Sequence, residues 1–323
     1  MGRFLVTGGA GFIGSHLVDR LIAGGDRVVV LDDLSSGRRD SLAEGVSFVQ
    51  GSILDADLVD RLAAGTDGIF HLAAQVSVQA CIDDWIGAHR INLDGALTVF
   101  LAAQRNGNIP TVFTSTAAIY GDSPSEFCAE GDAALPVSPY GADKLAAEHH
   151  LRALAETRGL PSVSLRLFNV YGDRQSPRSP YAGVIAKFLG NVLEGRPHTV
   201  FGDGLQVRDF IYVHDVVSGL LGAASFSAAR PGAHCFNICT GIGTTVIDLA
   251  RKIDGVSGRK PMAISHCPAR KGDIRISKGA GEAARERLGF SPAFTVDQGL
   301  ADMFRTWGKS DPEPPAQAKG SCA

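Results

Sequence analysis

The sequence predicts an α/β fold, a doubly wound parallel sheet with a smaller α/β lobe, and two observations carry this prediction. Strand-like apolar runs alternate with helical patterns through the first half of the 323 residues, as expected when helices join parallel strands. A glycine-rich turn, GGAGFIG at residues 8–14, connects the first strand to the first helix. The length and the apolar fraction of 45% suffice for one large unit with a sizeable core and a second lobe.

Six strands are predicted in the first half, and a helix begins at about Phe12 after the first of them. The strands are residues 3–8 (RFLVTG), 27–33 (RVVVLDD), 46–51 (VSFVQG), 68–74 (GIFHLAA), 111–116 (TVFTST) and 162–168 (SVSLRLF). A loop-rich stretch at residues 169–181 then precedes a helix near Val184 to Leu193, followed by shorter elements. We expect residues 1–168 to form the main domain, its sheet completed by later segments, residues 169–308 mainly the second lobe, and residues 309–323 a disordered tail.

The bulk composition excludes several classes of function. A net charge of −3 is too balanced to predict nucleic acid or an anionic membrane as a partner. The N-terminus runs straight into the glycine motif, so no signal peptide is predicted, and no apolar run approaches the roughly 20 residues of a membrane span. Cys235 and Cys239, with His234, lack a second cluster that would complete a metal site. We therefore expect no metal, buried thiols and a cytoplasmic location.

Gly8, Gly11 and Gly14 have the residue type and the position needed at a dinucleotide site. Glycines permit a tight turn and a close approach of the backbone to a pyrophosphate, while the helix start offers unpaired N–H groups. The second predicted strand ends in Asp32, where a carboxylate accepts hydrogen bonds from an adenosine ribose and repels a 2′-phosphate. The pattern predicts NAD rather than NADP, although Arg38 and Arg39 leave a 2′-phosphate contact open.

The stretch SPYGADK at residues 138–144 places Tyr140 and Lys144 one turn apart on a predicted helix. Taken alone, the pair is compatible with ordinary packing or with a catalytic base. A free tyrosine has a pKa near 10, and lowering it to about 7 requires roughly 4 kcal/mol of preferential stabilisation of the phenolate. The Lys144 ammonium and the positive nicotinamide ring of a bound cofactor together would supply that stabilisation.

Further motifs occur in a fixed order along the chain. They are the glycine motif at 8–14, HLAAQ at 71–75, Asn92, TSTAAIYG at 114–121, the Tyr140/Lys144 pair, LRLFNVYG at 165–172, GDGLQVRDFIYVHDV at 202–216 and RKGDI at 270–274. This ordered set resembles the extended short-chain dehydrogenase/reductase family, specifically its nucleotide-sugar epimerases and dehydratases, over nearly everything but the tail. The resemblance implies a Rossmann-type sheet, NAD as cofactor, a UDP-sugar substrate and a homodimer.

The resemblance also implies the site residues. Tyr140 is the base, Thr116 holds the substrate hydroxyl beside it, and Lys144 also holds the nicotinamide ribose. The implied cofactor-binding residues are Gly8, Gly11, Phe12, Ile13, Gly14, Asp32, Asp33, Ser35, Ser36, Gly37, Ser52, Ile53, Leu72, Ala73, Ala74, Gln75, Asn92, Thr114, Tyr140, Lys144, Phe168 and Val170. The implied substrate-binding residues are Ser77, Thr116, Tyr140, Asn169, Val184, Phe201, Arg208, Arg270, Asp273 and Ser277.

Within the substrate set, Arg208 and Arg270 match the family arginines that clamp the phosphates. Asp273 matches the acid that contacts the nucleoside ribose, and Asn169 the residue that contacts the diphosphate. Taken in isolation, Arg208 would more often form a surface ion pair beside Asp209.

Ala117 and Ala118 decide between the reactions of the family. Related 4,6-dehydratases carry an Asp-Glu pair there, which eliminates water, whereas two alanines transfer no proton. This favours 4-epimerisation of a UDP-hexose through a 4-keto sugar, with the cofactor regenerated. The alternatives are a UDP-glucuronate 4-epimerase, a nucleotide-sugar reductase or dehydratase, and a non-catalytic NAD-binding protein.

Five further positions depart from the family pattern or bear on substrate choice. Ser52 replaces an aspartate that contacts adenine, Leu167 replaces an aromatic residue, and Asp173 replaces a proline. By resemblance, Ser277 stands where a tyrosine restricts the pocket to plain hexoses, so a serine leaves room for an N-acetyl group. Uronate epimerases tend to carry an arginine where this chain has Ser176, which makes a glucuronate substrate a weaker expectation.

Overall fold

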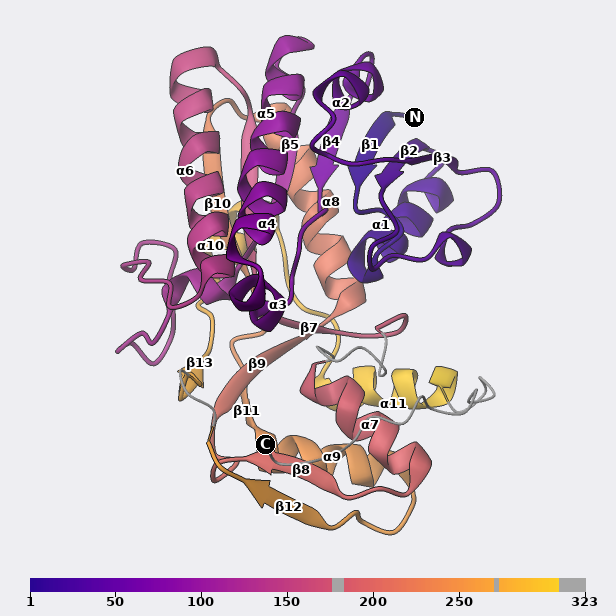
Figure 1. Cartoon of the computed structure of the whole chain (residues 1–323), viewed down its shortest axis with the longest axis vertical. Coiled ribbons are helices and arrows are strands. Elements are labelled where there is room, and N and C mark those ends of the chain that lie inside the picture. The colour runs from indigo at the N-terminus through magenta and orange to yellow at the C-terminus, as the bar shows by residue number, and fades with distance from the viewer. Residues whose placement is uncertain (176–182, 270–272, 308–323) are drawn as a thin grey trace.

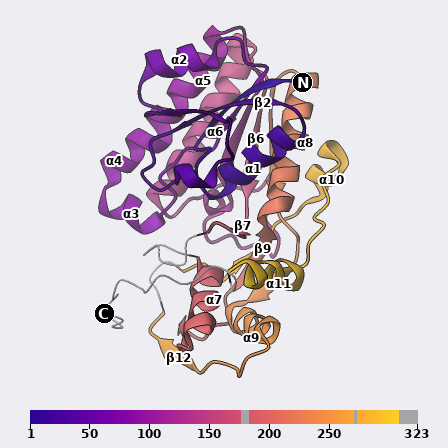
Figure 2. The same cartoon turned by 90° about the vertical axis from the view of Figure 1, so that its right-hand side faces the viewer.

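The computed structural model describes residues 1–175, 183–269 and 273–307. A large lobe built on a sheet lies above a smaller lobe in Figures 1 and 2, and the chain passes between them several times. The predicted tail at residues 309–323, together with Ser176 and Arg270, lies outside the described residues.

The large lobe contains a seven-stranded, wholly parallel sheet in the order β10-β6-β5-β4-β1-β2-β3. Its strands are β1 (Arg3–Thr7), β2 (Arg27–Asp32), β3 (Ser47–Gln50), β4 (Gly68–His71), β5 (Thr111–Thr116), β6 (Ser162–Leu167) and β10 (Ala233–Ile238). The order reverses between β1 and β4, and the carboxyl ends of the strands at such a switch point form a ligand crevice in parallel sheets.

Helices cover both faces of this sheet (Figure 2). One face packs against α1 (Phe12–Ala23) and α8 (Val213–Ala229). The other packs against α2 (Ala56–Ala63), α5 (Gly95–Arg105) and α6 (Pro139–Arg158). The buried strands are apolar on both sides, as parallel strands between two helical layers must be.

Short helices occupy the crevice end of the large lobe. α3 (Val78–Asp83) and α4 (Trp85–His89) lead through a π-helical turn, η2 (Arg90–Asp94), into α5. Two 3₁₀ turns, η1 (Arg39–Ser41) and η3 (Ala117–Tyr120), follow β2 and β5. η3 begins directly after Thr116, so the chain turns sharply at the carboxyl end of β5.

The small lobe combines two short sheets with helices. β9 (Val207–Tyr212) pairs with β11 (Gly243–Thr245), β13 (Ile276–Ser277) and β7 (Asn169–Tyr171), and β12 (Ile264–Cys267) pairs with β8 (His198–Phe201). Helices α7 (Val184–Glu194), α9 (Val246–Ser257) and α11 (Val296–Trp307) enclose a separate apolar core. α10 (Glu282–Leu288) returns to the large lobe beside β10.

The predicted fold class is confirmed, as are the six strands of the first half and the helix at Val184. The predicted loop after β6 is partly wrong, because Asn169–Tyr171 form β7, a parallel partner of β9. Cys81, Cys128 and Cys239 are buried free thiols and Cys235 is a half-buried one. Over the described ranges, no helix is long and apolar enough to cross a membrane.

Candidate active site

The glycine turn forms a cradle at the carboxyl end of β1. Gly8 has a φ of +71°, and a side chain there would come within 2.6 Å of the Ala73 nitrogen. A Cβ on Gly14 would lie 2.2 Å from the Gly8 carbonyl oxygen. The turn is therefore pressed against the Leu72–Ala73 segment and leads into the N-terminus of α1, where Gly11 is the N-cap and no acidic residue lies in the first turn. This geometry fits a pyrophosphate.

Asp32 is anchored at the end of β2. Its carboxylate accepts from the backbone N–H of Ala10 at 3.0 Å and of Leu34 at 2.9 Å, and burial raises the pKa of this carboxyl. A Cβ on Gly37 would lie 3.0 Å from the Asp32 Oδ1. The acid, the glycine turn and Gly37 thus meet at one place, as a dinucleotide ribose site requires.

The two nearby arginines are engaged elsewhere. Arg38 donates to Asp40 at 2.6 and 3.0 Å, and the Arg39 guanidinium carbon lies 4.9 Å from the centroid of the Phe48 ring. This geometry does not favour the open alternative, in which they meet a 2′-phosphate.

The HLAAQ segment is braced by Asn92, which is buried in the π-helical turn. The Asn92 Oδ1 accepts from the Gln75 nitrogen at 2.8 Å, and its Nδ2 donates to the Gln75 carbonyl at 3.1 Å. Ser77 caps α3 by accepting from the Ala80 nitrogen at 3.1 Å. Both residues therefore shape the loop between β4 and α3, which lies at the edge of the crevice.

Tyr140 and Lys144 lie in the first turns of α6, as predicted. Ser138 is the N-cap, accepting from the Gly141 nitrogen at 3.2 Å, and Pro139 occupies the first helical position, which suits its fixed φ and missing N–H. The Thr116 side chain interacts with the Tyr140 phenol and lowers its pKa. The Lys144 Nζ donates to the Thr114 carbonyl at 2.8 Å, so the end of β5 and the start of α6 are joined at the proposed catalytic residues.

Burial shifts the pKa values of both Tyr140 and Lys144. Burial raises the pKa of Tyr140 to about 12, and the hydrogen bond with Thr116 opposes that rise only in part. Burial also lowers the pKa of Lys144 to about 7. Lys144 directs its ammonium to Thr114 and lies 5.9 Å from the Tyr140 ring centroid. In the protein without cofactor the pKa of Tyr140 is therefore raised, and joint stabilisation of the phenolate by Lys144 and a bound nicotinamide stays a prediction.

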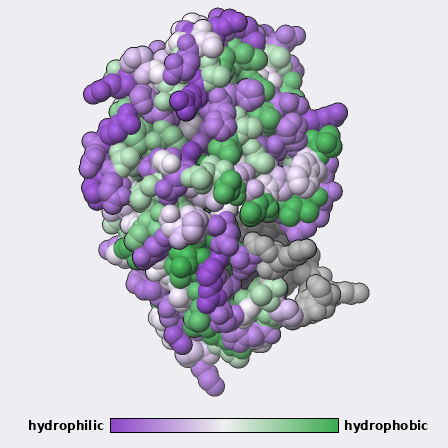
Figure 3. Space-filling view, turned by 90° about the vertical axis from the view of Figure 1, so that its left-hand side faces the viewer, coloured by the Kyte–Doolittle hydropathy of each residue, from purple (hydrophilic) through white to green (hydrophobic). Residues whose placement is uncertain are grey.

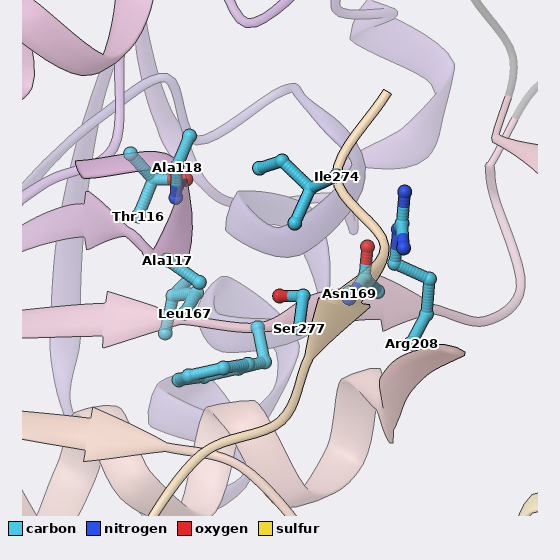
Figure 4. A pocket seen from close by; sticks show the side chains of 9 residues that line it. Thr116, Ala117, Ala118, Leu167, Asn169, Arg208, Ile274 and Ser277 are labelled. Carbon is cyan, nitrogen blue, oxygen red and sulfur yellow. Dashed lines mark hydrogen bonds between the residues drawn. The ribbon is translucent and has the colours of Figure 1, made fainter. Parts of the chain in front are cut away.

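A cavity of about 160 Å³ opens beside Thr116, between the two lobes (Figure 4). Thr116, Ala117 and Leu167 lie on one side, Ile274 and Arg208 on the other, and the Ser277 hydroxyl points into the space between them. Within the part of the chain that the structure describes, Arg208 is the one ionisable residue that lines it. Because Leu167 lines the cavity, the replacement of an aromatic residue there enlarges this space.

Arg208 and Asp273 form an ion pair at the small-lobe end of the cavity. Asp209, which the sequence offered as an alternative partner, is fully buried and accepts from the Thr240 and Gly241 backbone at 2.9 and 2.8 Å. It holds the turn before β11 in place beside Arg208. Asn169 donates to the Asp209 carbonyl at 3.0 Å.

Gln206 joins this group, although the sequence analysis missed it. Its Nε2 donates to the Phe201 carbonyl at 3.0 Å and to Asp273 at 3.3 Å. Its position two residues before Arg208 could have revealed it, because alternate residues of a strand share one face. Val184 lies farther off at the start of α7, packed against the small-lobe core.

The structure gives a local role to two residues that depart from the family pattern, Ser52 and Asp173. The Ser52 hydroxyl accepts from the Leu54 nitrogen at 3.1 Å, so it stabilises the turn after β3. Asp173 joins the lobes, because its carbonyl accepts from the His16 Nε2 at 3.0 Å and its carboxylate accepts from Thr306 at 3.2 Å. Burial lowers the pKa of His16 to about 4, which leaves it neutral at this contact at physiological pH. No group of three or more His, Cys, Asp or Glu arranged for a metal occurs in the described ranges.

Comparisons with known proteins find similarity over most of the chain. Residues 4–239 match the model of the NAD dependent epimerase/dehydratase family. A UDP-glucose 4-epimerase of Mycolicibacterium smegmatis is 40% identical over 94% of this chain and 98% of its own. The structure of a Thermotoga maritima UDP-glucose 4-epimerase with UDP-glucose superimposes with a TM-score of 0.88 at 38% identity, covering 95% of this chain and 99% of the other.

A second solved structure is a UDP-N-acetylglucosamine 4-epimerase from Methanobrevibacter ruminantium in complex with UDP-N-acetylmuramic acid. It superimposes with a TM-score of 0.89 at 34% identity, covering 95% of this chain and 98% of the other. The fold around the cavity is therefore shared with proteins named for plain and for N-acetylated sugars.

Proposed function

The chain belongs to the NAD dependent epimerase/dehydratase family, and on that premise we propose that it interconverts the C4 epimers of a UDP-hexose. The observation that carries the proposal is the cavity beside Thr116, the residue whose side chain interacts with Tyr140. Its wall continues through Ala117 and Ala118, neither of which can transfer a proton. This wall suits a reaction that acts only at C4 and does not suit removal of water from the sugar.

The chain's own residues have separate tasks in this proposal. The glycine turn and Asp32 hold the dinucleotide, and Lys144 fixes the nicotinamide ribose. Thr116 positions the sugar 4-hydroxyl, and Tyr140 accepts its proton and later returns it. When bound, NAD⁺ supplies the hydride acceptor and donor at C4. The cavity leaves room for the 4-keto sugar to turn over, so that reduction occurs on its other face.

Arg208 and Asp273 are proposed to receive the nucleotide diphosphate end. This proposal is supported by the position of the ion pair and the flanking Gln206 at the small-lobe end of the cavity. A planar guanidinium binds phosphate oxygens through two parallel hydrogen bonds. Binding of the UDP moiety would exchange the carboxylate partner of Arg208 for phosphate.

Incubation of the purified protein with UDP-glucose, with no added reductant, tests the function. The expected product is UDP-galactose, formed until the two sugars reach equilibrium while the bound cofactor ends in its starting oxidation state. A 4-keto-6-deoxy product would mean dehydration, and no conversion of UDP-glucose or UDP-N-acetylglucosamine by NAD-loaded protein would overturn the proposal.

Cofactor choice gives a separate prediction. Because the anchored Asp32 carboxylate accepts from ribose hydroxyls and repels a 2′-phosphate, NAD should bind at least about tenfold more tightly than NADP. Asp32→Ala should narrow that difference in a calorimetric titration. Arg38→Ala is the matched control and should leave NADP affinity unchanged, because Arg38 is paired with Asp40. Equal affinities in the unmodified protein would contradict the assignment of Asp32.

We also propose a cytoplasmic homodimer that buries the α3–α5 face. Exposed apolar side chains gather there, namely Val78, Ile82, Trp85, Ile86 and Leu101. Figure 3 views the molecule from the side of α6 and shows apolar residues near the middle of its surface. Several exposed apolar side chains on one face are typical of protein interfaces, and the molar mass in solution would test the dimer.

A further inference from the structure

One turn beyond Lys144 on α6, Glu148 forms a buried ion pair with Arg166 of β6. Glu148 is four residues after Lys144, so the two side chains share one face of α6. Lys144 is 1% exposed and Glu148 9% exposed. The Glu148 carboxylate accepts from the Nε and Nη2 of Arg166 on β6 at 2.8 to 3.2 Å. A charged pair this deep in the large lobe needs an explanation, because burying two charges is expensive even when they are paired.

Arg166 is fixed by more than its carboxylate partner. Its Nη1 donates to the Tyr120 hydroxyl at 2.9 Å and to the Glu130 carbonyl at 3.1 Å. The Tyr120 hydroxyl in turn donates to the Asn237 Oδ1 at 2.7 Å. These contacts join β6, η3 and β10 around one guanidinium, so the position of Glu148 is set from outside α6. Burial disfavours the charged guanidinium, yet the hydrogen bonds with Glu148 raise the pKa of Arg166 overall.

We propose that Glu148 is a positioning residue for Lys144: held by Arg166, its carboxylate keeps the Lys144 ammonium charged inside the large lobe. The inference rests on the epimerase function proposed above, in which a charged Lys144 holds the cofactor ribose. A neutral lysine would still donate a hydrogen bond but would lose its electrostatic attraction for the phenolate of Tyr140. Glu148 itself touches neither Tyr140 nor Thr116 in any contact seen in the described residues, so it acts through Lys144.

The charges around Lys144 support this role. Burial disfavours the charged ammonium, and Glu148 is the carboxylate that opposes this effect most strongly, ahead of Asp143. The Asp143 carboxylate also has a second partner, because its Oδ1 lies 2.7 Å from the Nδ1 of His89 on α4. His71 of β4 faces Lys144 with its pKa lowered to about 3 by burial, so it is neutral and adds no charge. The pKa of Cys81 on α3 is raised by burial, so it stays a thiol.

The test follows the ionisation of Lys144 directly, in protein without cofactor. With ε-carbon-13-labelled lysine, the resonance that Lys144→Met removes should titrate near pH 7, since burial sets the pKa of Lys144 to about 7. In Glu148→Gln the midpoint should move down by about one pH unit, the size typical of losing one nearby opposite charge. Glu156→Gln is the matched control on the exposed face of the same helix and should leave the midpoint unchanged.

Kinetics give the second measurement. The alkaline limb of the pH–kcat profile of Glu148→Gln should move to lower pH in step with the NMR midpoint, and Glu148→Asp should restore most of the shift. A merely structural Glu148 would lower kcat without moving either midpoint, and that result would overturn the proposal. Because the titration needs no turnover, it decides this inference even if the epimerase assay fails.

A second variant covers poor folding of Glu148→Gln. The double change Glu148→Met with Arg166→Met removes both charges and leaves neither unpaired, and such replacements of buried ion pairs are usually tolerated. It also lacks the Glu148 carboxylate, so its Lys144 midpoint should again lie below the wild-type value, by less than in Glu148→Gln because the Arg166 cation is removed as well. A midpoint at the wild-type value in this protein would overturn the proposal.

Discussion

Tyr140→Phe should lower the kcat of UDP-glucose epimerisation at least about a hundredfold, the usual loss for a general base, while NAD still binds. The phenol interacts with the Thr116 side chain, and the cavity that Thr116 lines has no described carboxylate or imidazole in its lining. Nothing in that lining could replace it as a proton acceptor. The measurement is steady-state turnover together with a calorimetric titration of NAD.

Tyr171→Phe is the matched control, because it removes the hydroxyl of a second tyrosine, one that is buried. Tyr171 lies in the small lobe, where its hydroxyl donates to the Val296 carbonyl at 3.2 Å. Its turnover should stay close to that of the unmodified protein. Near-normal turnover of Tyr140→Phe would mean that another group removes the proton, and the assignment of Tyr140 would be wrong.

The raised pKa of Tyr140 leads to a further prediction about the effect of the cofactor. In the protein without cofactor, burial holds the phenol protonated with a pKa of about 12. A base at neutral pH therefore needs further stabilisation of its phenolate, which the positive charge of a bound nicotinamide together with that of Lys144 would supply. We therefore expect the ionisation of Tyr140, followed by ultraviolet difference spectroscopy, to move to lower pH when NAD⁺ is added. Addition of NADH, whose ring is neutral, should produce a smaller shift.

The sequence predicted the large lobe well because its signals are local. An apolar run, a glycine turn and a helix cap are each read within about ten residues, and the six early strands recur in the structure at those places. The seventh strand, β10, was not predicted individually. It joins the sheet after the chain has passed through the small lobe. Its pairing with β6 is set by tertiary packing, which a short stretch of sequence does not reveal.

The candidate site was predictable to the extent that each residue sits in a motif. Tyr140, Lys144 and Thr116 were found this way and the structure brings them together. The contacts between site residues were harder to predict, because they join segments far apart in the chain. The pairing of Arg208 with Asp273 rather than Asp209, and the contact of Asp173 with His16, follow only from the three-dimensional arrangement. The electrostatic outcome at Tyr140 also depended on burial, which spacing does not report.

Sugar size is the second property on which a single side chain should have a large effect. Ser277 on β13 faces the cavity of about 160 Å³ that Thr116 and Leu167 also line. Strand pairing fixes its place, since Ser277 is in register with Arg208 on β9. A phenol at this position would occupy much of the cavity, and the serine together with Leu167 leaves that volume open. The unmodified protein should therefore turn over UDP-N-acetylglucosamine as well as UDP-glucose.

Ser277→Tyr should lower kcat/KM for UDP-N-acetylglucosamine by at least about a hundredfold, while that for UDP-glucose changes by less than about threefold. The asymmetry is expected because a filled pocket rejects a larger substrate by steric clash but loses little with one that never used the space. Ser277→Ala is the control, since it removes the hydroxyl without adding volume, and both sugars should react as before. If the tyrosine variant keeps its activity toward the N-acetyl sugar, the acetamido group does not pass this position, and the side of the cavity formed by Ile274 becomes the place to look for the size limit.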